Sequence, residues 1–157
     1  MATLTTVYGV NNTKTNVTLP TVKVPACEAG GRVRHLYDAY TVGAGDDFGT
    51  SGLVKLMTIP KGARVVGMQL VCPDLGTTGQ FEVGWAASAE SGAEIADPNG
   101  FFTTVTATSA VDSNMSGALP GWNKTFSEAV EVQIDFTQAT DVAAGLTIKI
   151  SLLYVLD

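Results

Sequence analysis

The chain has 157 residues and a mass of 16.3 kDa, the usual size of one domain with its own hydrophobic core. Charged residues make up only 15%, below the roughly 25% of an average globular protein, whereas 20 threonines and 17 glycines favour strands and tight turns. This composition argues against a helical bundle. The sequence has no apolar run of roughly 18 residues and no secretory signal, so we expect a soluble, unsecreted protein without a membrane partner.

Charge is distributed unevenly along the chain. Residues 1–35 have a net charge of +3 and residues 36–157 a net charge of −9. The acidic body would repel phosphates, so nucleic acid is not an expected partner. With so few charges, the asymmetry either arises by chance or reflects a basic N-terminal segment that lies on an acidic surface of a neighbouring subunit or partner. The basic residues of the segment are Lys14, Lys23, Arg32 and Arg34.

The N-terminal part differs in texture from the rest. Residues 1–30 are rich in Thr, Asn and Val, contain Pro20 and Pro25, and lack a helical period. These properties are typical of an extended arm or an edge strand. We therefore predict an extended arm over 1–30 and a β-sandwich domain over 31–157.

Strand-like runs and turns then alternate. Residues 53–59 and 64–72 predict two strands joined by a tight reversal at Pro60-Lys61-Gly62. After a break at 73–79, apolar residues alternate with polar or small residues over 81–86, which indicates a half-buried strand.

The middle of the chain gives weaker signals. Residues 87–96 predict a weak helical turn, which Asp97-Pro98-Asn99-Gly100 would end. Residues 101–111 predict a strand or a long insertion, and residues 112–124 predict a loop.

The last two strands have the clearest pattern. Apolar and polar residues alternate over 130–136 and again over 146–152, which predicts that the C-terminal strand lies inside a sheet. Seven or eight short strands without a β-α alternation predict an all-β, antiparallel β-sandwich of jelly-roll type. An immunoglobulin-like sandwich is the alternative, although no Cys…Trp…Cys pattern supports it.

Residues with catalytic potential are sparse. The sole histidine, His35, lies in a predicted strand without a serine or cysteine motif, so a role on a sheet face is expected. Cys27 and Cys72 lack C-x-x-C spacing and predict two reduced thiols, although a bridge between them stays open. Asp46 and Asp47 supply too few ligands for Ca²⁺ and predict a turn. We expect no enzyme, no metal and no cofactor.

Two tryptophans are candidates for a binding platform. Trp85 belongs to the apolar set of its strand, so it is expected in the core. Trp122 lies between Gly121 and Asn123 in a predicted loop and is expected to be exposed, either as a sugar-stacking ring or as an anchor in a protein contact.

One stretch resembles a known family. Residues 53–85 contain Leu56-Met57-Thr58-Ile59-Pro60-Lys61-Gly62-Ala63-Arg64-Val65, then Asp74-Leu75-Gly76-Thr77 and Phe81-Glu82-Val83-Gly84. The order of apolar strand, I/V-P-x-G-A-x-V, apolar strand, D-L-G-T and a V-G strand resembles small virion structural proteins of tailed bacteriophages. Two hairpin turns between three core strands would explain the motif physically.

The resemblance implies a capsid decoration, or cement, protein: a β-sandwich that forms a trimer or dimer, binds the major capsid protein on the outside of the head, and is assembled in the host cytoplasm. The matched segment is sandwich core, so candidate contact residues come from composition: Lys14, Lys23, Arg32, Arg34 and Trp122. A carbohydrate- or receptor-binding module of a tail or fibre, using Trp122 and a groove lined by Asp or Asn, is the alternative. A small metal-dependent hydrolase is a third alternative, disfavoured because the chain has only one histidine.

Overall fold

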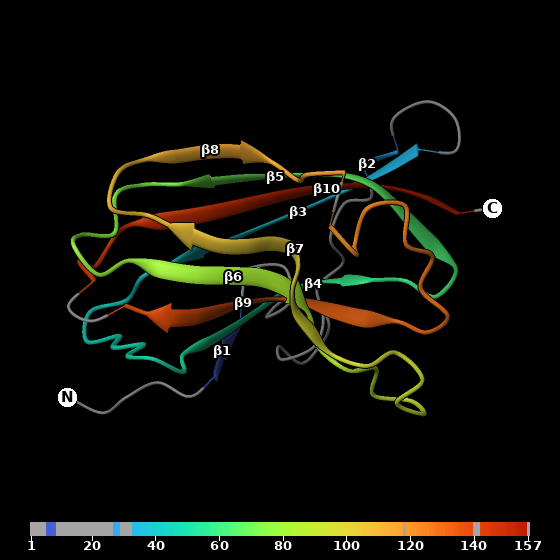
Figure 1. The fold of residues 1–157 in the computed structure, drawn as a ribbon, viewed down its shortest axis with the longest axis horizontal. Coiled ribbons are helices and arrows are strands. Elements are labelled where there is room, and N and C mark those ends of the chain that lie inside the picture. Colours follow the sequence, from blue (N-terminus) through green and yellow to red (C-terminus); the bar gives the residue numbers. More distant parts are fainter. Residues whose placement is uncertain (1–5, 9–26, 29–32, 118, 140–141, 157) are drawn as a thin grey trace.

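The computed structural model describes residues 6–8, 27–28, 33–117, 119–139 and 142–156, and in these residues every regular element is a strand (Figure 1). None of the described residues forms a helix that could cross a membrane. The strands are β1 (Thr6–Tyr8), β2 (Cys27–Glu28), β3 (Val33–Thr41), β4 (Leu53–Ile59), β5 (Ala63–Cys72), β6 (Gln80–Trp85), β7 (Asp97–Thr106), β8 (Val111–Asn114), β9 (Val130–Gln138) and β10 (Thr147–Leu156).

Two sheets of five strands form the sandwich. Sheet A has the order β1-β4-β9-β6-β7, and sheet B has the order β2-β3-β10-β5-β8. All pairs among the strands β3 to β10 are antiparallel, and of these eight strands only β6 and β7 follow each other within one sheet. Four strands per sheet in this order form a jelly roll. The predicted jelly-roll sandwich is confirmed, and the immunoglobulin-like alternative is wrong.

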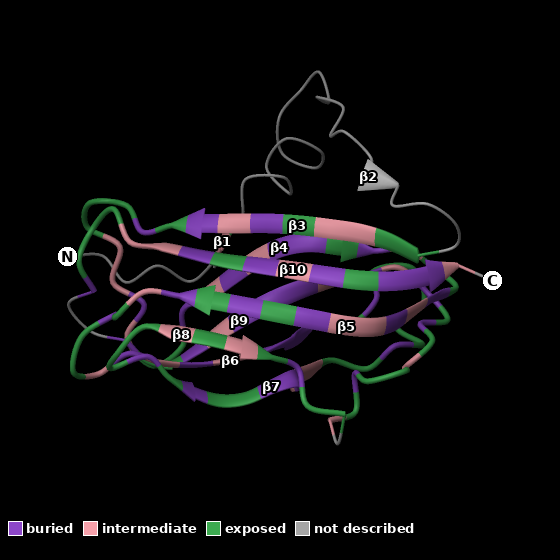
Figure 2. Ribbon diagram, turned by 90° about the horizontal axis from the view of Figure 1, so that it is seen from above, coloured by how far each residue is buried: buried purple, intermediate pink, exposed green. Residues whose placement is uncertain are grey.

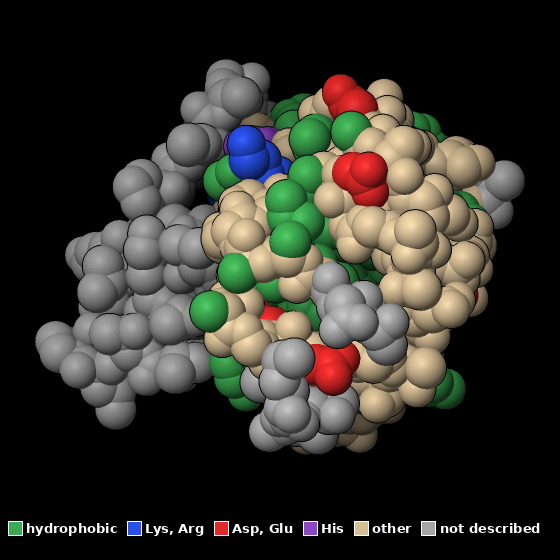
Figure 3. All heavy atoms as spheres, turned by 90° about the vertical axis from the view of Figure 1, so that its left-hand side faces the viewer, with side chains coloured by type: hydrophobic (Ala, Val, Ile, Leu, Met, Phe, Trp, Pro, Cys, Tyr) green, Lys and Arg blue, Asp and Glu red, His purple; other side chains and the backbone are tan. Residues whose placement is uncertain are grey.

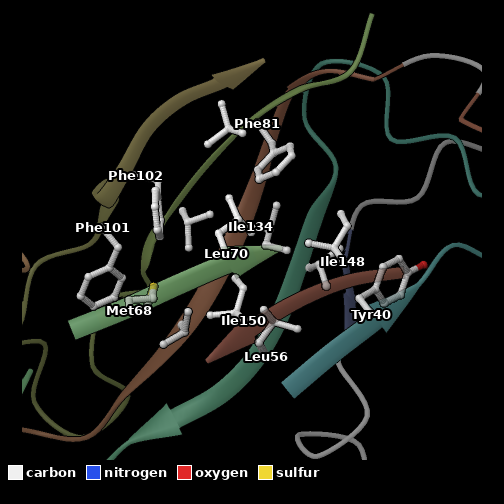
Figure 4. Packing of buried hydrophobic residues seen from close by; sticks show 14 of the residues in the cluster. Tyr40, Leu56, Met68, Leu70, Phe81, Phe101, Phe102, Ile134, Ile148 and Ile150 are labelled. Atoms are coloured by element: carbon white, nitrogen blue, oxygen red, sulfur yellow. The ribbon is translucent and has the colours of Figure 1, made fainter. Parts of the chain in front are cut away.

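The sequence pattern explains which faces are buried. The apolar residues of the alternating runs in β9 and β10 point between the sheets, as predicted, and aromatic rings fill the space around them (Figure 4). Phe48 and Phe136 stack with ring centroids 4.2 Å apart, and Trp85 meets Phe101 edge-on at 5.1 Å. Trp85 is 3% exposed, so its predicted core position is confirmed.

The two described pieces of the N-terminal segment lie on the sandwich. β1 pairs in parallel with β4, and β2 pairs antiparallel with β3. Since β3 and β4 are in contact, both pieces cover the same side of the molecule, one at the edge of each sheet. The predicted arm over 1–30 otherwise lies outside the described residues.

The turn signals in the sequence identified where the chain reverses but not which sheet the next strand joins. Residues 60–62 do not close a hairpin, because β4 belongs to sheet A and β5 to sheet B. Residues 73–79 likewise lead from β5 in sheet B to β6 in sheet A. The expectation of two hairpin turns was therefore wrong. In a jelly roll, consecutive strands usually face each other across the core, and an apolar alternation is compatible with either arrangement.

The middle of the chain also departs from prediction. Residues 87–96 form bends and no helix, because Ser88 and Ser91 donate hydrogen bonds to Glu128 and the Ser88 N–H bonds the Glu94 carbonyl. The expected break at Asp97–Gly100 is instead the start of β7, where a strand tolerates Pro98. Residues 112–114 of the expected loop, together with Val111, pair with β5 as the short edge strand β8.

Close packing between β6 and β7 requires glycine. A Cβ atom on Gly84 would lie 1.8 Å from the Asp97 carbonyl oxygen, and one on Gly100 would lie 2.1 Å from the Trp85 ring. Neither position accepts a side chain unless backbone or a buried ring moves. The close approach explains the irregular register between these strands.

We expect Gly84→Ala to lower the free energy of unfolding by about 1–3 kcal/mol, because the added methyl group overlaps backbone. Gly67→Ala is the matched control: its Cβ would meet only the end of Leu153 at 4.0 Å, so its effect should stay within about 0.5 kcal/mol. Urea denaturation followed by tryptophan fluorescence measures both. Equal stability of the two variants would contradict the close packing.

Candidate interaction surface

The outer face of sheet B carries exposed apolar side chains on strands that are otherwise polar on that side. Tyr37 of β3, Val71 of β5 and Leu153 of β10 are each 38–45% exposed. They point outward because the residue next to each of them in the chain, Asp38, Leu70 or Leu152, is buried on the inner face of the sheet. Figure 2 looks onto this face and shows β3, β10, β5 and β8 side by side with no described element across them.

A groove of about 500 Å³ runs over this face. Gly67 of β5 forms part of its floor, because the absence of a side chain leaves the sheet low there. Leu153, the cross-strand neighbour of Gly67, lines one side, and Trp122 also lines the groove. Gln69 and Asn114 add polar groups to the lining.

The backbone around Trp122 is held to the start of β5. Asn123 donates its N–H to the Val65 carbonyl, and the Val65 N–H bonds the Lys124 carbonyl. Asn123 has a φ of 57°, a left-handed conformation that asparagine tolerates. Because a Cβ on Gly117 would lie 3.7 Å from the indole, the Gly117 backbone lies against the Trp122 ring.

Trp122 is 39% exposed, which agrees with the prediction of an exposed ring. Its role in a contact stays a prediction. Arg34 is exposed on β3, next to Glu28 of β2 in the register, and does not line the groove. The other predicted contact residues, Lys14, Lys23 and Arg32, lie outside the described residues.

Gly67 and Leu153 line the groove but were not among the predicted site residues. Both left a signal: Gly67 interrupts the strand 64–72, and Leu153 breaks the alternation by placing a leucine at an outward position after Leu152. A glycine within a strand predicts a position where no side chain covers the sheet. A large apolar residue at an outward position of the alternation predicts an exposed apolar side chain.

A network of charged and hydroxyl groups ties together the loops at one end of the sandwich. Lys124 lies 2.9 Å from Glu94 and stands over the rings of Trp85 and Phe126, 5.4 and 5.0 Å from their centroids. Glu94 also accepts hydrogen bonds from the N–H and hydroxyl of Ser127. Burial alone would raise the pKa of Glu94, but Lys124 and Ser127 outweigh burial and lower it. This network holds residues 94 and 124–127 together, next to the chain segment that carries Trp122.

His35 and the carboxylates of the predicted turns have structural partners. His35 Nε2 lies 2.7 Å from Ser151 Oγ on the neighbouring strand. Asp46 accepts hydrogen bonds from the Gly43 N–H and the Tyr40 hydroxyl, and burial together with this carboxylate raises the pKa of Tyr40. Asp46 therefore closes its own turn, as predicted. In the part of the chain that is described, no three His, Cys, Asp or Glu side chains lie close enough to hold a metal.

Cys72 is a free thiol in the core, and burial raises its pKa to about 12. Cys27 lies on β2, which is three strand spacings from β5 in sheet B. Three spacings are about 14 Å, twice the longest Cα separation that a disulfide spans. The Cys27–Cys72 bridge that the sequence left open is therefore not formed.

The outer face of sheet A holds two adjacent carboxylates. Glu82 of β6 and Asp135 of β9 are cross-strand neighbours. Partial burial and the charge of Glu82 raise the pKa of Asp135. Viewed from one end, the molecule shows separate carboxylate groups, a single small cluster of Lys or Arg, and apolar side chains between them (Figure 3).

The sequence has no match among protein-family models or curated proteins. Solved structures do match. A chain of the capsid of Ralstonia phage GP4 aligns with a TM-score of 0.70 and 17% identity, over 97% of this chain and 98% of that chain. The fold is that of chains in phage capsids. A chain of the cyanophage Pam1 capsid asymmetric unit aligns with a TM-score of 0.63 and 21% identity, over 91% of this chain and 98% of that chain. The resemblance of residues 53–85 to phage virion proteins is thus matched by the fold of the whole chain.

Replacing Glu94 with Gln should lower the free energy of unfolding at pH 7 by about 1–2 kcal/mol, because Lys124 and Ser127 lose a charged partner, while Lys124 itself stays partly exposed to solvent. Since folding lowers the pKa of Glu94, its contribution is present above the unfolded value of about 4.3 and is lost as the pH falls through the folded value. Thermal denaturation from pH 7 to pH 3 should show the difference between variant and wild type shrinking. A constant difference would contradict the ion pair.

Asp135→Asn should change the free energy of unfolding in the opposite direction and stabilise the protein. Because folding raises the pKa of Asp135, its ionised form opposes folding at neutral pH and does so less as the pH falls through the raised value. We expect the variant to gain about 0.2–1 kcal/mol at pH 7, the size of one cross-strand charge effect. The gain should disappear at pH 3, and a loss of stability at pH 7 would contradict the repulsion between Glu82 and Asp135.

Proposed function

We propose that the protein is a non-enzymatic structural component of a phage virion, and specifically a decoration, or cement, protein. In this role it binds the major capsid protein on the outside of the head, after assembly in the host cytoplasm, and stabilises the shell. The observation that carries the proposal is the alignment of almost the whole chain with almost the whole of a chain from the Ralstonia phage GP4 capsid.

Two features of the molecule support this role. Several titratable side chains of the jelly roll have structural hydrogen bonds. His35, Asp46, Glu94 and Glu128 each form a hydrogen bond with another part of the fold. The apolar outer face of sheet B, in contrast, exposes side chains that a second protein would cover. A protein that holds a shell together needs such contacts and many copies acting together.

The basic N-terminal segment is proposed to contact the shell. Its described pieces, β1 and β2, lie at the edges of the two sheets, beside β4 and β3. Removing residues 1–25 takes away β1 but none of the eight jelly-roll strands. We therefore expect the truncated protein to remain folded by circular dichroism and to bind capsids at least tenfold more weakly than the full chain.

The experiment mixes purified protein with capsids that lack it, separates bound protein by sedimentation, and compares the full chain with the truncated one. A full chain that does not sediment with capsids would overturn the proposal. Equal binding by both chains would leave decoration intact but assign it to the sandwich. A truncated chain that does not fold would show that residues 1–25 belong to the core.

A carbohydrate- or receptor-binding module of a tail or fibre is the second candidate. The exposed ring of Trp122 beside Asn114 and Gln69 in the groove favours it, because aromatic rings stack on sugars while amides bond their hydroxyls. Under this function, host-surface glycans should bind the wild type, and Trp122→Ala should abolish binding.

A further inference from the structure

The outer face of sheet B gathers most of the large apolar side chains that the described residues expose. Five of the seven belong to it or to its border: Val33, Tyr37, Val71, Leu153 and Trp122. The other two lie elsewhere, Tyr8 on β1 and Ile95 in the loop between β6 and β7. A concentration of this kind on one face is typical of a protein contact.

The strands around Val71 supply about half the area that a stable contact between two proteins requires. β10, β5 and β8 have 10, 10 and 4 residues, so at about 3.3 Å per residue and about 4.8 Å per strand they cover roughly 400 Å² before the loop of Trp122 is added. A stable interface takes roughly 800 Å² from each partner.

The register of sheet B indicates which partner fits. Val71 on β5 has Lys149 beside it on β10 and Asp112 beside it on β8, and both charged residues are exposed. The face therefore carries opposite charges at equal spacing on the two sides of one apolar residue. A two-fold axis parallel to β5 turns this pattern onto itself, so that β10 of each copy faces β8 of the other and Lys149 of each copy meets Asp112 of the other. β3 then lies outside the overlap, so Val71, Leu153 and Trp122 are the exposed apolar side chains that enter the contact.

The same rotation matches the apolar groups. Leu153 lies on the β10 side of Gly67, whereas Trp122 lines the groove together with Asn114 and Met115 at the end of β8. Turned about β5, Leu153 of one copy comes to lie opposite Trp122 of the other. Aligned packing of two sheets about 10 Å apart is an ordinary arrangement.

We propose that the outer face of sheet B packs against the same face of a second copy of this chain, forming a two-fold dimer. The inference rests on the proposed function for its biological role, since it names the surface through which copies on a shell would pair. Its test uses purified protein without capsids, so the failure of one proposal is distinguishable from the failure of the other.

Cross-linking tests the symmetry directly. In the proposed dimer the two Val71 residues face each other across the axis at about the 10 Å spacing of the sheets, which is too far for a disulfide, so Val71→Cys should give a covalent dimer with a bis-maleimide cross-linker that spans this distance. Ile95→Cys is the matched control, because Ile95 is also exposed and apolar but lies off the face; it should give no more dimer than the wild type with its two natural cysteines. A ring of head-to-tail contacts would leave the two copies of residue 71 apart, and an absence of cross-linking would overturn the proposal.

Charge exchange tests the partner. Lys149→Glu and Asp112→Lys should each raise the dissociation constant at least tenfold, because like charges then meet twice across the axis. The combined variant restores opposite charges and should return to the wild-type constant. Leu153→Glu should give a monomer by light scattering, whereas Ile95→Glu should not. A monomeric or trimeric wild type, or a combined variant as weak as the single ones, would overturn the proposal.

Discussion

The burial of inward-facing side chains between the two sheets holds every other feature in place. β9 and β10 have a neighbouring strand on each side, and their inward residues Ile134, Phe136, Ile150 and Leu152 are at most 1% exposed. Each such side chain contributes about 1.5–3 kcal/mol when it leaves water. Since alternate residues of a strand point to opposite faces, fixing Leu152 in the core also fixes Leu153 outside it. The apolar surface on sheet B is thus a direct consequence of the core.

The position of the loop that carries Trp122 depends on a second constraint, which includes an ion pair. Lys124 bonds Glu94 and covers two aromatic rings of the core, and the backbone from Asn123 to Phe126 bonds the start of β5. Trp122 is therefore presented by a loop whose ends are attached to the sandwich. A ring held in this way loses little conformational entropy when a partner covers it, which favours its use as an anchor.

The alternation of apolar and polar residues predicted those features of the fold that depend on a single strand. It identified the strands 130–136 and 146–152, the buried Trp85 and the antiparallel sandwich, because a half-buried strand needs only its own pattern. It failed where structure depends on distant residues. Ser88 and Ser91 donate hydrogen bonds to Glu128, some 40 positions away. These bonds hold residues 87–96 in bends, although the local sequence favours a helical turn. The hairpin expected around Pro60 failed because no local signal distinguishes a return within a sheet from a crossing between sheets. The groove was missed because it forms only when β5, β10 and the loop of Trp122 come together.

The central place of β10 also affects how the molecule forms. β10 pairs with β3, and the hydrogen-bonded residues His35 and Ser151 are 116 positions apart in the sequence. Sheet B therefore cannot close until residues 147–156 have left the ribosome, and β3 and β5 must wait with unpaired edges until then. Folds dominated by such distant pairings fold slowly and are exposed to aggregation while they do so. Their unfolding requires the same central strand to be withdrawn from two neighbours at once, so a jelly roll of this order is suited to persist long after synthesis has ended.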